Sequence, residues 1–465
     1  MDNCEPLGWF GAGVLLLTAG LILIPYLRRR GTLLSAWNLL LLGIFIFVGL
    51  GCFEAALSPM RFHGLEWFNP TRAEVHWFVA ANTVFLAVLL VSHRYDPLPS
   101  KVSDILLSKW PPITVPVIFY VLMACALVML AHLLFSRVVF FAQLFQNLSH
   151  KAAVFASVFG FVLWHRNRRN MFWLALSIGV FLGACFYSML AGGGRRLLLS
   201  VLFGPVLYLY MAHARHWRPM KGAVSVAIAS VILFVCTLMY SSIRHYDSVK
   251  GSEGRTASGL LRQLENLTTI NWADRFLKDQ LHFLSQQTVH YALLTHHYIN
   301  TGELEPKSLN TIRFVLAYPI PRSMWPQKPS ALGIVIVTDA VRYQGYTNWG
   351  CGISGQVVYE GGLFVAALYG YLAAFFISLF DKPLVKQPTN PFLIAMLAAA
   401  SAHLLAWPRG DLGIMTNESL ECFLFAIVLG IGGRLLFGVD RSVQGTSVNA
   451  VYLRNIVQIP RSRNT

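Results

Sequence analysis

Three short motifs place arginine beside glycine or proline, where a guanidinium group could bind an anion. In Gly192–Arg196 three glycines precede two arginines, and in Pro408–Asp411 one arginine lies between a proline and a glycine. The third motif is the proline-rich run Tyr318–Pro329, which contains one arginine. Guanidinium forks bind phosphate oxygens in pairs, and neighbouring glycines let the backbone approach a ligand closely. The motifs predict a pyrophosphate-binding site made by Arg195, Arg196, Arg322 and Arg409.

Each motif also has a simpler interpretation. A single arginine outside a membrane commonly contacts lipid headgroups, and a glycine triplet commonly forms a helix-breaking turn. The triplet is not a nucleotide-binding loop, because no Lys-Ser/Thr pair follows it. The topology predicted below places all three arginine motifs on the same side of a membrane, and this coincidence favours the anion-binding site.

Two carboxylates near these motifs could act on a proton. Asp411 follows Arg409 by two residues, and Glu360 lies where a membrane span is predicted to begin. A carboxylate at the membrane edge is a functional candidate. An acid at a helix N-terminus also stabilises the helix dipole, and Asp411 could simply pair with Arg409. We keep both interpretations open. Further candidates of the same kind are Glu54, Glu418 and Glu421.

Four more side chains are candidates for contacts with a glycan or a phosphate. Gln356 and Tyr359 stand in the same turn as Glu360, and Trp325 and Lys328 belong to the Tyr318–Pro329 run. Aromatic rings can stack on sugar faces, although Trp and Tyr also favour the membrane interface. Neither a zinc motif nor a nucleotide motif is found, so the sequence predicts no metal and no cofactor.

The composition sets the class of protein. Of the 465 residues, 55% are hydrophobic and only 12% are charged, and the mean hydropathy is +0.55. Soluble domains carry about 25% charged residues. A soluble multidomain enzyme is therefore excluded, and a polytopic helical membrane protein is favoured. The net charge of +16 fits basic loops that fix membrane topology better than it fits nucleic-acid binding.

Apolar runs predict an all-α protein with eleven membrane spans. The predicted spans are Trp9–Tyr26, Leu33–Leu57, Val75–Val91, Ile113–Phe135, Ala152–Trp164, Met171–Leu190, Leu197–Met211, Ala223–Tyr240, Val357–Leu379, Pro391–Trp407 and Met415–Phe437.

Basic residues in alternate loops set the predicted orientation. Arg28–Arg30 follow the first span, which places the N-terminus outside and the C-terminus in the cytoplasm. We expect four parts: an N-terminal bundle of about eight spans (1–240), a large external loop with short amphipathic helices (241–354), about three C-terminal spans (355–440) and a basic cytoplasmic tail (441–465). All three arginine motifs then lie on the external side.

The order of these motifs resembles the bacterial oligosaccharide repeat-unit polymerases of the Wzy type, which include the O-antigen and enterobacterial common antigen polymerases. The resemblance covers about residues 185–437. Its most specific element is Pro-Arg322-x-x-Trp325-Pro-x-Lys328-Pro, followed by Gly-Gln356-Val-Val-Tyr359-x-Gly-Gly at the next span. The chain departs from the family where several members have an acid, because Gln356 is neutral and Glu360 takes a position that is Asn in those members.

The resemblance implies a metal-independent, GT-C-like glycosyltransferase in the bacterial inner membrane, with its site on the periplasmic face. It would move a growing glycan from undecaprenyl pyrophosphate onto a new lipid-linked repeat unit. Arg195, Arg196, Arg322, Lys328 and Arg409 would then bind the pyrophosphate, and Asp411 or Glu360 would act on the acceptor hydroxyl. The implied partners are the lipid-linked oligosaccharide, the bilayer and a chain-length regulator.

Two rival functions stay open. An O-antigen ligase shares the large external loop but transfers glycan to lipid A core. A transporter or flippase for lipid-linked sugars would need charges through the membrane midplane and internal repeats, and neither is found in the sequence.

Overall fold

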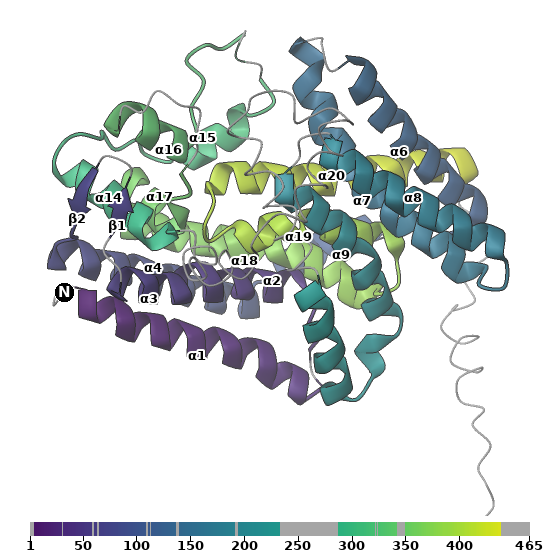
Figure 1. The fold of residues 1–465 in the computed structure, drawn as a ribbon, viewed down its shortest axis with the longest axis horizontal. Coiled ribbons are helices and arrows are strands. Elements are labelled where there is room, and N and C mark those ends of the chain that lie inside the picture. Colours follow the sequence, from purple (N-terminus) through teal and green to yellow (C-terminus); the bar gives the residue numbers. More distant parts are fainter. Residues whose placement is uncertain are drawn as a thin grey trace, which may run out of the picture.

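A computed structural model of the chain is almost entirely helical (Figure 1). The structure describes residues 4–29, 31–57, 60–62, 65–107, 110–111, 113–135, 139–190, 194–232, 287–320, 322, 324–341 and 349–438. One short hairpin, formed by β1 (Met60–Phe62) and β2 (Leu65–Phe68), interrupts the helices. The second half of the predicted eighth span, the stretch 241–286 of the external loop and the tail 441–465 lie outside the described residues.

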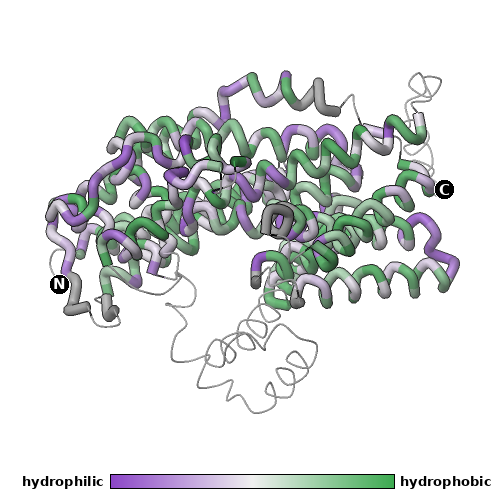
Figure 2. The backbone as a smooth tube through the Cα atoms, turned by 90° about the horizontal axis from the view of Figure 1, so that it is seen from above, coloured by the Kyte–Doolittle hydropathy of each residue, from purple (hydrophilic) through white to green (hydrophobic). Residues whose placement is uncertain are grey.

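Seven helices in the described part are long and apolar enough to cross a membrane. They are α1 (Glu5–Leu27), the continuous helix Ala36–Leu57, α4 (Arg72–Tyr95), α6 (Val115–Phe135), α8 (Met171–Leu190), α18 (Leu363–Lys386) and α20 (Leu412–Phe437). Figure 2 shows hydrophobic residues along much of the helical part of the chain. The chain therefore has the build of a multi-pass membrane protein. Eleven spans and a GT-C fold stay predictions.

The remaining described apolar helices are shorter or more polar. They are α9 (Gly194–Ala212), α19 (Pro391–Ala406), the helix Pro219–Ile232 and α7 (Val139–Arg166). The sequence predicted only Ala152–Trp164 for α7, which was too short. The helix begins thirteen residues earlier, and its polar first half carries Asn147 and Lys151 into the protein.

Side chains at the helix starts explain where several helices begin. Thr71 and Glu74 form a capping box on α4: the Thr71 hydroxyl accepts from the Glu74 N–H at 3.3 Å, and the Glu74 carboxylate accepts from the Thr71 N–H at 2.8 Å. The Asn390 side chain accepts from the Phe392 N–H, and Pro391 fills the first position of α19. These local signals are readable in the sequence.

The second span combines α2 (Ala36–Gly43), a π-helical stretch η2 (Ile44–Leu50) and α3 (Gly51–Leu57). Gly43 lies against α19 so closely that an added Cβ would stand 2.2 Å from the Leu405 carbonyl oxygen. Only glycine allows the two backbones this approach. The contact holds α2 beside α19, which is one of the helices that line the polar cavity described below.

The ninth predicted span is broken, so the prediction of one helix over Val357–Leu379 was wrong. The helix α17 (Gly352–Glu360) ends at Gly361 and Gly362, whose φ angles are +140° and +74°, and α18 begins at Leu363. L side chains rarely adopt such φ values, and glycine does so without steric cost. Glu360 therefore ends a short helix instead of entering a long one.

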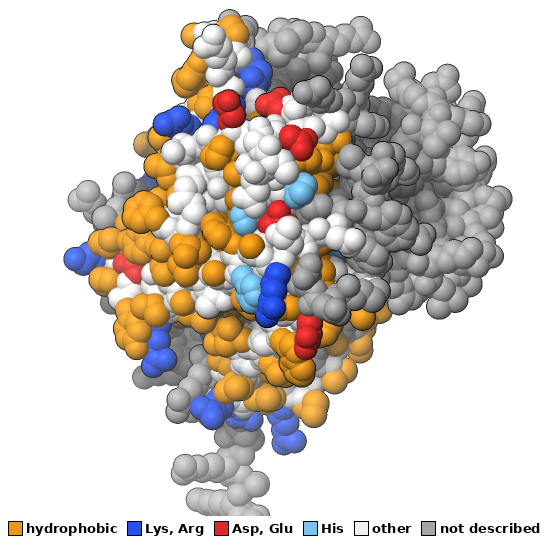
Figure 3. Space-filling view, turned by 90° about the vertical axis from the view of Figure 1, so that its left-hand side faces the viewer, with side chains coloured by type: hydrophobic (Ala, Val, Ile, Leu, Met, Phe, Trp, Pro, Cys, Tyr) orange, Lys and Arg blue, Asp and Glu red, His pale blue; other side chains and the backbone are white. Residues whose placement is uncertain are grey.

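Four short elements cover one end of the bundle, and they belong to the segment predicted to be external, which we call the external segment. They are α14 (Thr288–Asn300), α15 (Asn310–Ala317), α16 (Leu332–Val335) and the π-helical turn η5 (Ile336–Ala340). The helix α14 contacts α17, α3 and α4 and buries most of its residues. Figure 3 shows this side of the molecule, with acidic and histidine side chains among uncharged side chains and backbone, above an area dominated by hydrophobic side chains.

The predicted basic loops meet at the other end. The Tyr26 hydroxyl at the end of α1 donates to the Pro219 carbonyl, and the Asp381 carboxylate near the end of α18 accepts from the N–H groups of Ala36 and Trp37. The basic loops that follow α1, α9 and α18 therefore lie together at one physical end of the bundle. Which compartment this end faces stays a prediction.

Candidate active site

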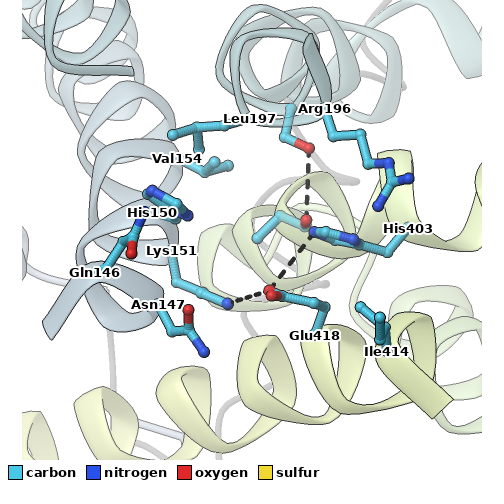
Figure 4. A pocket seen from close by; sticks show the side chains of 12 residues that line it. Gln146, Asn147, His150, Lys151, Val154, Arg196, Leu197, His403, Ile414 and Glu418 are labelled. Atoms are coloured by element: carbon cyan, nitrogen blue, oxygen red, sulfur yellow. Dashed lines mark hydrogen bonds and ion pairs between the residues drawn. The ribbon is translucent and has the colours of Figure 1, made fainter. Parts of the chain in front are cut away.

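A polar cavity of about 230 Å³ lies between α7, α9, α19 and α20, toward the end covered by the external segment (Figure 4). Its lining brings together ionisable side chains from all four helices. The polar lining residues are Gln146, Asn147, His150, Lys151, Arg196, Ser200, His403 and Glu418. Such a concentration of charge inside a membrane protein marks a functional site by default.

Lys151 is the most deeply buried charge of the cavity, with 2% of its side chain exposed. Its Nζ atom lies 2.5 Å from an Oε2 of Glu418 and 2.6 Å from an Oε2 of Glu421. The two glutamates stand three residues apart on α20 and so share one helix face. Asn147, one turn before Lys151, donates to the Glu421 carboxylate at 3.1 Å and to the Tyr318 hydroxyl at 3.0 Å. This network joins α7, α20 and the external segment.

Arg196 and His403 line the opposite part of the cavity (Figure 4). Arg196 Nη1 lies 3.4 Å from the Met415 sulfur, and His403 Nε2 lies 3.9 Å from a Glu418 carboxylate oxygen. Arg196 stands at the start of α9 and His403 near the end of α19, so neighbouring helix termini bring them together. A guanidinium, an imidazole and a carboxylate around one space can hold an anion and move a proton.

The predicted residues Gln356 and Asp411 support the start of α20 and do not line this cavity. The side-chain amide oxygen Oε1 of Gln356 accepts a hydrogen bond from the Leu412 N–H at 3.0 Å. Asp411 Oδ1 accepts from the N–H groups of Gly413 and Ile414 at 3.0 and 3.2 Å, as an N-cap. Burial raises the pKa of Asp411, although neighbouring backbone N–H groups partly offset this. The helix-start interpretation therefore describes what Asp411 does in this structure.

Glu360 holds the break between α17 and α18 against the start of α15. Its two carboxylate oxygens accept from the Thr311 hydroxyl at 2.6 Å and the Thr311 N–H at 2.9 Å, and the Tyr369 hydroxyl also donates to it. Burial raises the pKa of Glu360 to about 7, while the hydrogen bonds from Thr311 and Tyr369 oppose the shift. The neighbouring Tyr359 is fully buried, and its hydroxyl has no hydrogen-bond partner within the described part of the chain.

Arg322 and Lys328 close their own loop. Arg322 donates to the carbonyls of Lys328 and Pro329 and to the Ser330 hydroxyl, and Lys328 donates to the carbonyls of Tyr318 and Ile320 at 2.8 and 2.9 Å. This loop reaches the cavity network through the Tyr318 hydroxyl.

The other predicted residues of the external side are placed apart from the cavity or lie outside the description. Trp325 is 41% exposed. The Arg409 carbonyl accepts from the Gly352 N–H at 3.0 Å, and its guanidinium is near Tyr291. The Arg195 side chain lies outside the described residues. Of the predicted arginines whose side chains are described, Arg196 alone lines the polar cavity.

Sequence reasoning missed His150, Lys151 and His403 and gave little weight to Glu418. The available signal was a lysine directly before an apolar run, together with two acids spaced three apart in the last span. Charges at both places need partners in a membrane. A pairing between the lysine and the two acids was therefore a possible prediction. The sequence of neither segment, however, indicates which helices face each other.

A second, apolar cavity of about 310 Å³ lies on another side of α20. Its walls come from α15, α18, the end of α19 and α20, and include Leu316, Phe376, Trp407 and Leu412. Its few hydroxyl groups are engaged: Thr311 and Tyr369 bond Glu360, and Thr416 accepts from the Trp407 indole at 3.2 Å. The first turns of α20 thus separate the polar cavity from the apolar cavity.

The described residues contain no group of three or more His, Cys, Asp or Glu side chains that could hold a metal ion. No protein-family model, curated protein or solved structure matches the chain.

Proposed function

We propose that this membrane protein is a glycosyltransferase that polymerises oligosaccharide repeat units carried on undecaprenyl pyrophosphate, at the external face of a bacterial inner membrane. The observation that carries the proposal is the polar cavity, where Arg196, His403 and Glu418 surround one space. A lipid diphosphate donor needs a cation for its leaving group, and a sugar acceptor needs a group that takes a proton.

The reaction assigns one role to each side chain. An acceptor hydroxyl attacks the anomeric carbon of the donor glycan, and the bond between that carbon and the diphosphate oxygen breaks. The electron pair leaves with the diphosphate, whose charge Arg196 stabilises. The hydroxyl proton passes to His403, and Glu418 stabilises the imidazolium that forms. Lys151 holds Glu418 in place through their 2.5 Å ion pair. In this scheme Asp411 and Glu360 position helices.

The apolar cavity supports a substrate with a lipid carrier. Residues of α18 and α20, two helices long and apolar enough to cross a membrane, line it, and the first turns of α20 lie between it and the charged cavity. A polyprenyl chain could therefore occupy apolar space while its diphosphate reaches Arg196. A soluble sugar nucleotide would have no use for this second space.

The test is polymer formation with Arg196→Ala. Purified full-length protein would be given the lipid-linked repeat unit of its own host, and products would be separated by gel electrophoresis. Loss of one transition-state contact to the leaving group should lower the rate by about 100-fold or more. Arg313→Ala is a matched control, because Arg313 is exposed on α15 and does not line the cavity. It should leave the ladder unchanged.

His403→Gln should also stop elongation. If Arg196→Ala and His403→Gln both made full ladders, the cavity would not be the catalytic site. The ligase alternative gives a different result in cells: a null mutant would still make long glycan, which would stay on its lipid carrier.

A further inference from the structure

A second cluster of basic groups lies at the end of the bundle far from the polar cavity. His165 at the end of α7 and His213 just after α9 bring their Nε2 atoms to 2.9 Å from each other. Arg168 directs one guanidinium nitrogen to both, at 2.9 Å from His213 Nε2. Lys151 and His165 are fourteen residues apart on α7, about 20 Å along the helix, so the two sites are separate.

The cluster has more donors than acceptors. A hydrogen bond between the two imidazole nitrogens needs a proton on one of them, so at most one can accept. Arg168 has only donors. The Tyr208 hydroxyl bonds His165 Nδ1 at 3.0 Å and fixes that ring in place. Three basic side chains therefore meet at one point, where their N–H donors outnumber the lone pairs that could accept a hydrogen bond.

Charge decides which ligand would fit. Two converging imidazoles could suggest a cation, but the permanently charged guanidinium of Arg168 would repel it. No described carboxylate forms an ion pair with Arg168 or His165. An anion with several oxygens would supply the missing acceptors and convert repulsion into attraction. Arg166 follows His165 directly in the chain and adds positive potential.

We propose that His165, Arg168 and His213 bind the phosphate group of an anionic phospholipid at this end of the bundle. The cluster stands where α7 and α9 end, at the end of the bundle that carries basic loops, and basic pockets at the ends of membrane helices bind anionic lipid headgroups. The same chemistry would take a free phosphate ion, so the source is decided by experiment. This inference does not depend on the proposed glycosyltransferase activity.

The experiment measures ligand-induced thermal stabilisation of the purified full chain in detergent. Three probes are titrated: dihexanoyl phosphatidylglycerol, dihexanoyl phosphatidylcholine and inorganic phosphate. Wild type should gain Tm with phosphatidylglycerol and far less with phosphatidylcholine. Arg168→Gln should weaken apparent binding by about tenfold, as expected for one lost charge-assisted hydrogen bond.

Arg169→Gln is the control, because it removes the same charge one residue further along the chain. The Arg169 side chain is exposed, and in the described part of the chain it makes no hydrogen bond to either histidine. It should bind as wild type does. His213→Gln is a second test variant of similar size, in case Arg168→Gln does not fold. If Arg169→Gln weakens binding as much as Arg168→Gln, the attraction is a general charge effect and the site is wrong. The site is also wrong if no probe raises Tm. Equal stabilisation by inorganic phosphate would keep the phosphate site and assign it to a soluble anion.

Discussion

Replacing Lys151 with methionine tests the buried charge network that holds the polar cavity together. Lys151 compensates two glutamates at 2.5 and 2.6 Å and is 2% exposed. Methionine keeps the apolar volume but leaves two neighbouring carboxylates without their cation. Removing one partner of a buried ion pair costs about 3–5 kcal/mol. We therefore expect Lys151→Met to lower the free energy of unfolding by about that amount.

The design separates charge from packing. The triple variant Lys151→Met, Glu418→Gln, Glu421→Gln has no buried charge in the network, and replacing a whole buried ion pair is often nearly neutral. It should recover most of the loss. Lys307→Met removes an exposed lysine and should change stability by less than about 0.5 kcal/mol. The assay is the free energy of unfolding from denaturant titration in detergent. The reasoning fails if the triple variant is as unstable as the single one, or if Lys151→Met equals wild type.

Two further predictions follow from the site and its supports. Because burial raises the pKa of Glu360 to about 7 from 4.5, the folded protein binds the proton more tightly than the unfolded chain. Stability contributed by Glu360 is thus present below about pH 4.5 and lost as pH rises through 7, by up to about 3 kcal/mol. The difference in unfolding free energy between wild type and Glu360→Gln should change with pH over this range, and parallel curves would contradict it. Gly43→Ala should lower the free energy of unfolding by about 1–3 kcal/mol, because its Cβ would stand 2.2 Å from the Leu405 carbonyl. Gly13→Ala on α1 meets no atom within 4 Å and should be neutral or slightly stabilising in the same measurement.

Much of the fold could be predicted from the sequence because apolar length is a local property. The prediction Met171–Leu190 matches α8, and Pro391–Trp407 matches α19 to within a residue. The basic loops also indicated which helix ends meet. The failures have local causes that hydropathy does not measure. The Gly361–Gly362 break lies inside an apolar run, and the polar half of α7, with Asn147 and Lys151, lies outside the apolar run Ala152–Trp164.

The candidate site was predicted only in part. Arginine at the start of α9 was a correct place to look, and Arg196 lines the cavity. Asp411, Gln356 and Glu360 stand out in the sequence because each is polar at a helix boundary, but the same position suits a cap. Sequence position alone does not separate a capping group from a group that faces a ligand.

By itself, the sequence determined that the chain is a multi-pass helical membrane protein with basic residues in alternate loops, since span length and loop charge are set residue by residue. Only the tertiary structure decided which charges share a space. Lys151 and Glu418 are 267 positions apart, and Arg196 and Met415 are 219 apart. Such pairs depend on which helix faces touch. That choice is made by packing, including close approaches such as Gly43 against Leu405, and no single segment contains it.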